Sequence, residues 1–446
     1  MSISSKLHRL IIYPIVTYLK GYSVKNDLKD MLDSQYFSHE KILELQQKKL
    51  IKITTFAKKS EHYKDIPIFD PTEQPLDLWL KTLPILEKRD LRENFENLLT
   101  RNPSLWDSIK TSGGSTGAAV TVYKNREAMS KELASAWRGY KWANVEIGDL
   151  QARFWGVPYS FIGRVKSKLI DFVTHRIRFS AFRFSNRDLE GYKAIVARKK
   201  PSYFYGYVSM LREFSQNCQN DDQNYFKSVK SVICTSEVLT TVDRKLFAKT
   251  FGAKIFNEYG CGEVGTIAHE CEFGNLHIND ESLLLEVVDS SLKPLPKGQV
   301  GELLVTDLNN NLMPLIRYKI GDYGRLTNQE CKCGSSLSIL EGIYGRAYDI
   351  VKNKAGMSFH GEFFLYFIED IKKNGVNVEG IQFEVFKDKV LIKVACENAE
   401  FDSICTYITT NLKQKFCNET HYQFLHVDNI KRENSGKLRV VKLMDS

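Results

Sequence analysis

The sequence predicts an α/β protein with a large N-terminal domain and a small C-terminal α+β domain. Between residues 150 and 320, short apolar segments alternate with segments of helical composition, which is typical of layered α/β domains. Two apolar segments, Leu283–Val288 and Gly301–Val305, are joined by residues that include Pro and Gly, and this predicts an antiparallel pair. The large domain should therefore contain mixed sheets and helices, with its site at the carboxyl ends of strands.

The N-terminal part of the large domain is predicted to be mostly helical. Over residues 1–60, Leu and Ile recur among Lys and Gln at roughly helical spacing. Prolines between 67 and 75 then predict a loop. Residues 82–92 predict a short extended piece that enters a helix, and another helix is expected over 126–145.

The remaining elements follow in chain order. In the large domain we expect strands at Ala152–Val157, Ser202–Tyr205, Val229–Thr235 and Lys254–Phe256, and helices at Asp188–Ala197 and Thr241–Thr250. After a hinge at Gly342–Gly345 we expect helices at Glu362–Lys372 and Phe401–Phe416, and strands at Ile381–Phe386, Val390–Val394 and Phe424–Val427. The chain is thus divided into 1–80 and 81–344, which together form the large domain, and a mobile domain at 345–446.

Composition indicates a globular protein in a reducing compartment. The 446 residues are 43% hydrophobic and 26% charged, with a net charge of +9. Basic residues gather over 164–200, which favours a solvated face or a site for an anionic substrate over a nucleic-acid interface, so no nucleic acid is expected as a partner. Nine cysteines without a secretory signal predict a cytoplasmic location.

The apolar run Leu10–Leu19 is too short to span a bilayer and contains Pro14. With Lys6, Arg9 and Lys20 around it, the run could rest on a membrane surface, so peripheral membrane contact through the N-terminus is one interpretation. The favoured interpretation is a helix that packs on its own domain.

A Gly- and hydroxyl-rich stretch precedes an expected strand over 121–123. Its residues are Thr111, Ser112, Gly113, Gly114, Ser115, Thr116 and Gly117. Glycine lets successive N–H groups point into one concavity, which suits phosphate oxygens. A flexible turn is the alternative, and the spacing excludes a Walker loop because no Gly-Lys-Ser/Thr follows.

Five further motifs accompany this stretch. They are Cys234-Thr-Ser-Glu-Val, Asn257-Glu-Tyr-Gly-Cys-Gly-Glu263, Arg317-Tyr-Lys-Ile-Gly-Asp322, Gly345-Arg346 and Ser435-Gly-Lys437-Leu-Arg439. In this order and spacing they resemble the adenylate-forming ligase superfamily. The resemblance covers about 80–446 and is nearest to the phenylacetate–CoA ligase-like branch, which includes the CapK-like proteins of capsular polysaccharide biosynthesis.

The resemblance implies a two-step reaction in which a carboxylic acid attacks the α-phosphate of Mg-ATP and a thiol, amine or hydroxyl then displaces AMP. It implies that the stretch 111–117 holds the β- and γ-phosphates and that Glu263 ligates Mg²⁺. The remaining ATP-binding residues that it implies are Ser236, Glu237, Asn257, Tyr259, Gly260, Asp322 and Arg346. Lys437 would neutralise charge between the carboxylate and the α-phosphate.

Three features depart from the family pattern. Gly262 stands where Thr or Ser is usual, and Tyr348 stands where a charged residue usually follows the hinge arginine. The Pro and Lys that often follow the glycine loop are also missing. These departures leave the pivot of the small domain and the contacts to the α-phosphate open.

Four residues form a second, metal-like set. Cys271 and His277 are separated by five residues, and Cys331 and Cys333 flank one residue in a predicted turn. Three thiolates and one imidazole complete a tetrahedral Zn²⁺ site, and the phenylacetate ligase branch looks similar here. His269 is a competing ligand, and buried free thiols without a metal are the alternative.

The sequence thus favours an AMP-forming ligase that transfers an acyl group to CoA or a related thiol. Transfer to an amine or hydroxyl of a polysaccharide precursor is the first alternative. A non-catalytic nucleotide-binding scaffold is the second, supported by the departures at Gly262 and Tyr348. Retention of Glu263, Asp322, Arg346 and Lys437 together argues against the scaffold.

Overall fold

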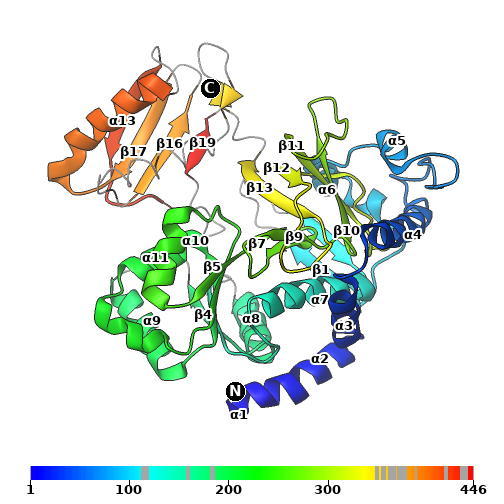
Figure 1. The fold of residues 1–446 in the computed structure, drawn as a ribbon, viewed down its shortest axis with the longest axis horizontal. Coiled ribbons are helices and arrows are strands. Elements are labelled where there is room, and N and C mark those ends of the chain that lie inside the picture. Colours follow the sequence, from blue (N-terminus) through cyan, green and yellow to red (C-terminus); the bar gives the residue numbers. More distant parts are fainter. Residues whose placement is uncertain are drawn as a thin grey trace. The chain divides into compact units, whose positions relative to one another are not determined.

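A computed structural model gives the fold of the chain (Figure 1). It describes residues 2–111, 120–156, 161–180, 186–346, 351–352, 358–359, 368, 378, 380–386, 389–415, 420–431 and 440–444. Two compact units are present, one made of Met1–Ile320 with Arg325–Gly342 and the other of Gly321–Gly324 with Ile343–Ser446. The predicted domain border at residue 345 stays a prediction.

The chain begins with helices, as predicted. They are α1 (Ile3–Leu7), the π-helix η1 (His8–Ile12), α2 (Tyr13–Leu19), α3 (Val24–Ser34) and α4 (His39–Ala57). The Ser2 side chain accepts a hydrogen bond from the Ser5 N–H at the start of α1, and Ser38 accepts one from the Lys41 N–H at the start of α4. These caps satisfy N–H groups that have no partner within a helix.

The segment after the proline-containing loop also follows the prediction. It contains α5 (Leu76–Lys81), α6 (Lys88–Glu93), the 3-10 helix η2 (Phe95–Leu98), β1 (Ser108–Thr111), β2 (Thr121–Lys124) and α7 (Arg126–Trp142). Glu87 and Asp90 form a capping box that fixes the start of α6. β2 is the strand expected after the Gly-rich stretch, whereas β1 was not predicted.

An eleven-stranded mixed sheet organises the fold, in the order β10-β11-β12-β13-β9-β8-β7-β6-β5-β3-β4. Its parallel part consists of β3 (Gln151–Trp155), β4 (Arg176–Ser180), β5 (Tyr203–Tyr207), β6 (Ser231–Thr235) and β7 (Lys254–Cys261). The other strands are β8 (Gly265–Glu270), β9 (Leu276–Ile278), β10 (Leu283–Val288), β11 (Val300–Asp307), β12 (Tyr318–Thr327) and β13 (Ile339–Arg346). β10 and β11 are antiparallel, which confirms the predicted pair and the mixed sheet.

Helices cover both faces of the parallel strands because alternate side chains point to opposite faces. The helices of this part are α8 (Phe161–Val173), α9 (Asn186–Lys199), α10 (Val208–Gln216), η3 (Asn220–Phe226) and α11 (Thr241–Phe251). Phe154 and Phe204 pack with residues of α9, α10 and α11 on one face, and Tyr203 and Tyr205 pack with residues of α3 and α7 on the other. Each buried Phe contributes about 1.5–3 kcal/mol to stability.

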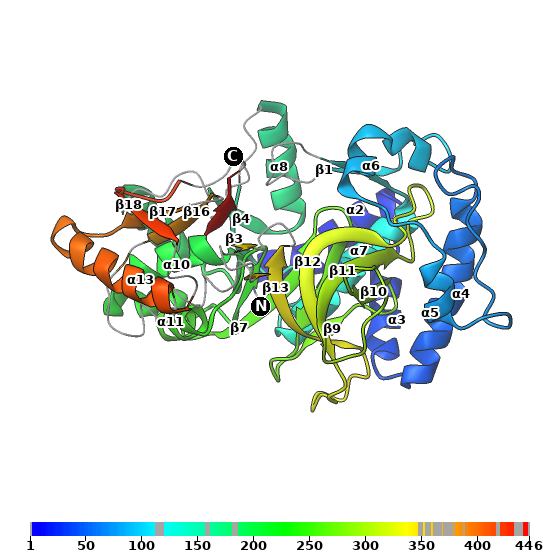
Figure 2. The same ribbon diagram turned by 90° about the horizontal axis from the view of Figure 1, so that it is seen from above.

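The second unit contains a four-stranded sheet with a helix on one face (Figure 2). Its strands are β16 (Gly380–Val385), β17 (Lys389–Ala395), β18 (His421–His426) and β19 (Val441–Leu443), in the order β18-β17-β16-β19. α13 (Phe401–Lys415), preceded by the 3-10 helix η5 (Asn398–Glu400), packs on them through Ile404, Ile408 and Leu412. The short strands β14 (Val351–Lys352) and β15 (Ser358–Phe359) pair with each other.

Some predicted elements of the small domain are confirmed, and one lies almost entirely outside the described residues. β16 and β17 confirm the two expected strands and pair antiparallel, and α13 confirms the helix. The expected helix Glu362–Lys372 lies outside the described residues except for helical Ile368. Within the described part of the chain, every helix is too short or too polar to cross a bilayer.

Candidate active site and thiol cluster

The Gly-rich stretch connects the two strands of a hairpin. β1 and β2 pair antiparallel, with Thr111 opposite Thr121. Ser112, Gly113, Gly114, Ser115, Thr116 and Gly117 lie between them and are outside the described residues. The hairpin therefore fixes Thr111, the first residue of the predicted phosphate-binding stretch, beside the strand that follows the stretch.

Lys124, the last residue of β2, anchors this hairpin inside the large unit. Its Nζ donates hydrogen bonds to the Val264 carbonyl (2.7 Å), Glu132 Oε2 (2.8 Å) and Asp307 Oδ2 (3.2 Å). Burial alone would lower the Lys124 pKa, but the two carboxylates raise it above its usual value, so the side chain stays charged. The cation joins the Gly-rich hairpin to the residue that follows Glu263, a link that sequence reasoning missed.

Glu263 lies just after β7 and is buried, with 5% of its surface exposed. Its Oε1 is 3.5 Å from Nζ of Lys88, at the start of α6. A buried carboxylate suits a hard divalent cation, because oxygen is the donor that Mg²⁺ prefers. The residue present thus fits the predicted ligand, and Lys88 is an additional charged neighbour of the site.

Ser236 and Glu237 form the turn after β6. Ser236 adopts a left-handed φ of 66°, which marks a tight turn at this strand end. Glu237 accepts hydrogen bonds from the Ser209 N–H (2.6 Å) and the Ser209 hydroxyl (2.9 Å), in the first turn of α10. A carboxylate is favourable there because it satisfies helix N–H groups and faces the positive end of the helix dipole.

Asn257, Tyr259 and Gly260 lie on β7, where Asn257 pairs with β6 and Tyr259 and Gly260 pair with β8. The Asn257 N–H donates to Glu270 Oε2 at 2.7 Å, and Tyr259 is buried. The register shifts between Tyr259 and Gly260, and a Cβ at Gly260 would lie 2.3 Å from the Gly265 carbonyl oxygen. This close approach of β8 requires glycine at position 260.

The other predicted ATP-site residues belong to the second unit. Asp322 lies on β12 in the stretch Gly321–Gly324, and Arg346 is the last residue of β13. The Arg346 side chain, Tyr348 and Lys437 lie outside the described residues. The roles implied for Asp322, Arg346 and Lys437 therefore stay predictions.

The structure brings the four predicted thiol and imidazole ligands together. The Sγ atoms of Cys271, Cys331 and Cys333 and one ring nitrogen of His277 all lie within 4.8 Å of one another. Cys271 Sγ is 3.5 Å from Cys331 Sγ, and Cys333 Sγ is 3.3 Å from His277 Nε2. Tetrahedral Zn–S bonds of about 2.3 Å would place sulfurs about 3.8 Å apart, so this donor set fits Zn²⁺.

Neighbouring groups orient these donors. His277 Nδ1 donates to the Leu337 carbonyl at 3.2 Å, so Nε2 faces the thiols, and Asn275 Nδ2 donates to Cys331 Sγ at 3.1 Å. Backbone hydrogen bonding of this kind fixes the tautomer of metal-binding histidines. The competing residue His269 instead contacts the Glu270 carbonyl at 2.9 Å, and burial lowers its pKa to about 4.

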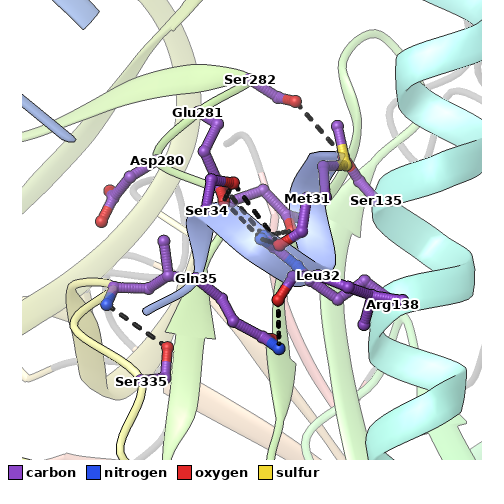
Figure 3. A network of polar contacts seen from close by, with 12 residues as sticks. Met31, Leu32, Ser34, Gln35, Ser135, Arg138, Asp280, Glu281, Ser282 and Ser335 are labelled. Atoms are coloured by element: carbon purple, nitrogen blue, oxygen red, sulfur yellow. Dashed lines mark hydrogen bonds and ion pairs between the residues drawn. The ribbon is translucent and has the colours of Figure 1, made fainter. Parts of the chain in front are cut away.

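A buried ion pair holds the segment that follows His277 (Figure 3). Arg138 on α7 donates to both Glu281 oxygens (2.5 and 3.1 Å) and to Asn279 Oδ1 (2.6 Å), and Ser34 Oγ on α3 donates to Glu281 Oε1 (2.7 Å). The Arg138 side chain is fully buried. This network, which the sequence analysis missed, ties the N-terminal helices to the segment beside the thiol cluster.

The chain is similar in sequence to known proteins over most of its length. Residues 356–443 match the family described as CapK C-terminal domain. Protein CapK of Staphylococcus aureus is 22% identical over 374 residues, which cover 81% of this chain and 79% of that protein. Phenylacetate-coenzyme A ligase of Thermus thermophilus is 36% identical over 129 residues, but these span only 28% of this chain and 29% of the ligase.

Solved structures show a similar fold. 2-Hydroxyisobutyryl-CoA ligase in the postadenylation state with 2-HIB-AMP matches with a TM-score of 0.73 and 17% identity, covering 91% of this chain and 90% of that one. An open conformation of the same ligase with 2-HIB-AMP and CoA matches with a TM-score of 0.57 and 17% identity, covering 90% and 91%. The predicted fold class and the resemblance drawn from the motifs are confirmed.

Proposed function

We propose that this chain, which has the fold of the adenylate-forming ligases and resembles their CapK-like branch, uses ATP to activate a carboxylic acid as an acyl-adenylate, with release of pyrophosphate. The observation that carries the proposal is the link between the Gly-rich hairpin and the Glu263 segment. Lys124 of β2 donates to the Val264 carbonyl, so the proposed phosphate-binding stretch and the proposed metal ligand share one anchor.

The predicted residues that contact ATP or the reacting groups have the following roles in this proposal. The stretch 111–117 holds the β- and γ-phosphates, and bound Mg²⁺ on Glu263 would screen the charge of the phosphates. The turn at Ser236 and the strand end at Tyr259 flank the adenine. The ribose and reaction-centre roles fall to Asp322, Arg346 and Lys437, with Lys437 stabilising negative charge as the carboxylate attacks the α-phosphate.

For the acceptor we propose CoA or a related thiol. Support comes from the named relatives, because the Thermus thermophilus protein and the 2-hydroxyisobutyryl ligase are both called CoA ligases. Acyl transfer to an amine or hydroxyl of a polysaccharide precursor is the second candidate, since the C-terminal match and the longest sequence match are both to CapK.

We further propose that the thiol cluster holds a structural Zn²⁺. The four donors converge, each from a different position of β8–β9 or the 331–339 segment, and no donor position is left open for a substrate. The ion would tie the Cys271 turn to the Cys331 turn. Thiol ligands also support the cytoplasmic location expected from the sequence.

The reaction is tested by pyrophosphate release from Mg-ATP across a panel of carboxylic acids, with hydroxylamine present to trap acyl-adenylates. We expect release with one class of acid, and a loss on the order of 10²–10³ in rate when Lys437 is replaced by Ala. Adding CoA to the active mixture then tests the acceptor. If no aryl, fatty, hydroxy or amino acid gives pyrophosphate release although ATP still binds, the non-catalytic scaffold is favoured.

A further inference from the structure

The N-terminal helical segment Ile3–Leu19 turns an apolar stripe outward. Its most exposed large residues are Ile3 (88%), Leu10 (70%), Tyr18 (81%) and Leu19 (67%), and Leu7, Ile11 and Ile15 are also exposed. Successive positions in this set are three or four residues apart or adjacent, which places them along one side of the helical segment. The opposite side packs inward, where the Tyr13 hydroxyl accepts a hydrogen bond from Trp137 Nε1 at 2.8 Å.

Helix α8 presents a second outward stripe. Val165, Leu169 and Phe172 lie four and three residues apart and are 53%, 64% and 59% exposed. On the inner side, Asp171 is buried and pairs with Arg178 at 2.7 Å. The helix is therefore anchored by an ion pair and keeps its apolar side chains in solvent.

The two stripes belong to one packed region of the large unit. The ring of His8 contacts Phe172 (5.6 Å between centroids) and stacks on His175 (4.0 Å), and Ser4 Oγ lies 3.0 Å from His175 Nε2. Figure 1 shows the α1–α2 segment at the lower edge of this unit, next to α8. These contacts fix the N-terminal segment against the end of α8.

The charges beside the stripes are mainly basic, although Arg9 pairs with Glu146 at 3.4 Å. The first 26 residues contain Lys6, Arg9, Lys20 and Lys25 and no acidic residue, and the stretch 150–170 also contains none. Lys166 and Lys168 are exposed on either side of the α8 stripe. An apolar stripe with basic borders is the pattern by which helices bind in the plane of an anionic bilayer surface.

A second copy of the chain is a poorer match for this surface. In a two-fold interface each side meets the same surface on its partner, so the lysines along the stripes would mostly face one another, since nearby Glu146 is already paired with Arg9 and Lys141. We infer that the α1–α2 and α8 stripes bind the surface of an anionic lipid bilayer and hold the protein there as a peripheral protein. The inference is independent of the proposed reaction.

The test is co-sedimentation of the full-length chain with phosphatidylcholine vesicles that contain or lack phosphatidylglycerol. We expect binding only with the anionic vesicles, at least about tenfold weaker for Leu10→Glu and for Leu169→Glu. Lys6→Gln and Lys20→Gln should each weaken it about fivefold. Leu78→Glu is the matched control, because Leu78 is 48% exposed on α5, which lies far from α1, α2 and α8 in Figure 1, and its replacement should leave binding unchanged.

Three outcomes would overturn the inference. The first is absence of wild-type binding to anionic vesicles, and the second is equal binding by Leu10→Glu and wild type. The third is a dimer in analytical ultracentrifugation that Leu10→Glu dissociates while vesicle binding is absent, which would assign the surface to a second copy. Pyrophosphate release should be unchanged in all five exposed-residue variants, so a failure here is distinguishable from a failure of the proposed reaction.

Discussion

The thiol cluster and the nucleotide motifs are both assembled from residues far apart in the sequence, but their contacts differ in kind. In the cluster, four donor atoms face one another within 4.8 Å and neighbouring groups aim two of them inward. In the motifs, Glu237 caps α10, and Gly260 is required by the close approach of β8. Convergence of donors therefore points to a ligand, whereas residues of a motif can owe their identity to the fold.

The largest expected effect concerns the buried ion pair between Arg138 and Glu281, which holds the segment beside the thiol cluster. Replacing Arg138 with Met leaves the Glu281 carboxylate buried without its cation, and should lower the free energy of unfolding by about 3–5 kcal/mol. Urea unfolding measures this change. If the cluster depends on the fold around it, the zinc content of purified Arg138→Met should fall as well.

The control for that variant is Lys52→Met. Lys52 pairs with Glu127 at 3.3 Å, and both side chains are exposed (53% and 39%), so its loss should cost less than about 1 kcal/mol. Equal destabilisation by the two variants would contradict a special role for the buried pair.

The second prediction tests the cluster directly. Cys331→Ser, or removal of zinc by a chelator, should lower the free energy of unfolding by on the order of 3 kcal/mol, because metal binding contributes to folding. Metal analysis should show about one zinc per wild-type chain and less in Cys331→Ser. The matched control is Cys218→Ser, whose thiol donates to the Phe214 carbonyl and lies outside the cluster.

The prediction of a zinc site would be contradicted if the wild-type protein, isolated and dialysed against Zn²⁺, bound no metal. In that case the four residues would be a cluster of reduced thiols. The nearby Arg138 network would then support the 276–283 segment without any contribution from a metal.

The third prediction concerns the motif residue with the strongest claim to chemistry. Glu263→Gln keeps the size of the side chain but removes its charge, so it should slow pyrophosphate release by about a hundredfold. Steady-state rates at varied Mg²⁺ would measure the loss, which higher Mg²⁺ should partly restore. An unchanged rate and Mg²⁺ dependence would place Glu263 with the structural residues, as the partner of Lys88.

Sequence reasoning succeeded where residue type or local periodicity carries the information. β10 matches its predicted bounds, and the Cys-x-Cys spacing singled out thiols that the structure brings together, because cysteines are few and chemically distinctive. It also predicted a strand at Lys254–Phe256, but β7 extends to Cys261 because pairing with β8 continues through a bulge. Such pairing is decided by the partner strand rather than by local composition.

The buried ion pairs could not be predicted for a similar reason. Arg138 and Glu281 are 143 residues apart, and Lys124 and Asp307 are 183 residues apart. Nothing near either residue distinguishes it from a solvated charge, and only the packing of α7, β2 and the 279–307 segment brings the partners together. The Glu237 cap is hidden in the same way, since its helix begins 29 residues earlier.

The smallest expected effect tests whether Glu237 caps a helix or contacts the nucleotide. Glu237→Gln keeps an acceptor oxygen for the Ser209 N–H but loses the charge at the start of α10, so stability should fall by about 1 kcal/mol. If Glu237 acts only as a cap, the KM for ATP and the rate of pyrophosphate release should stay within about twofold of wild type. A large rise in the KM for ATP with unchanged stability would instead place its carboxylate in contact with the nucleotide. Thermal unfolding and ATP titration of the same preparation therefore decide whether this strand end serves the helix or the substrate.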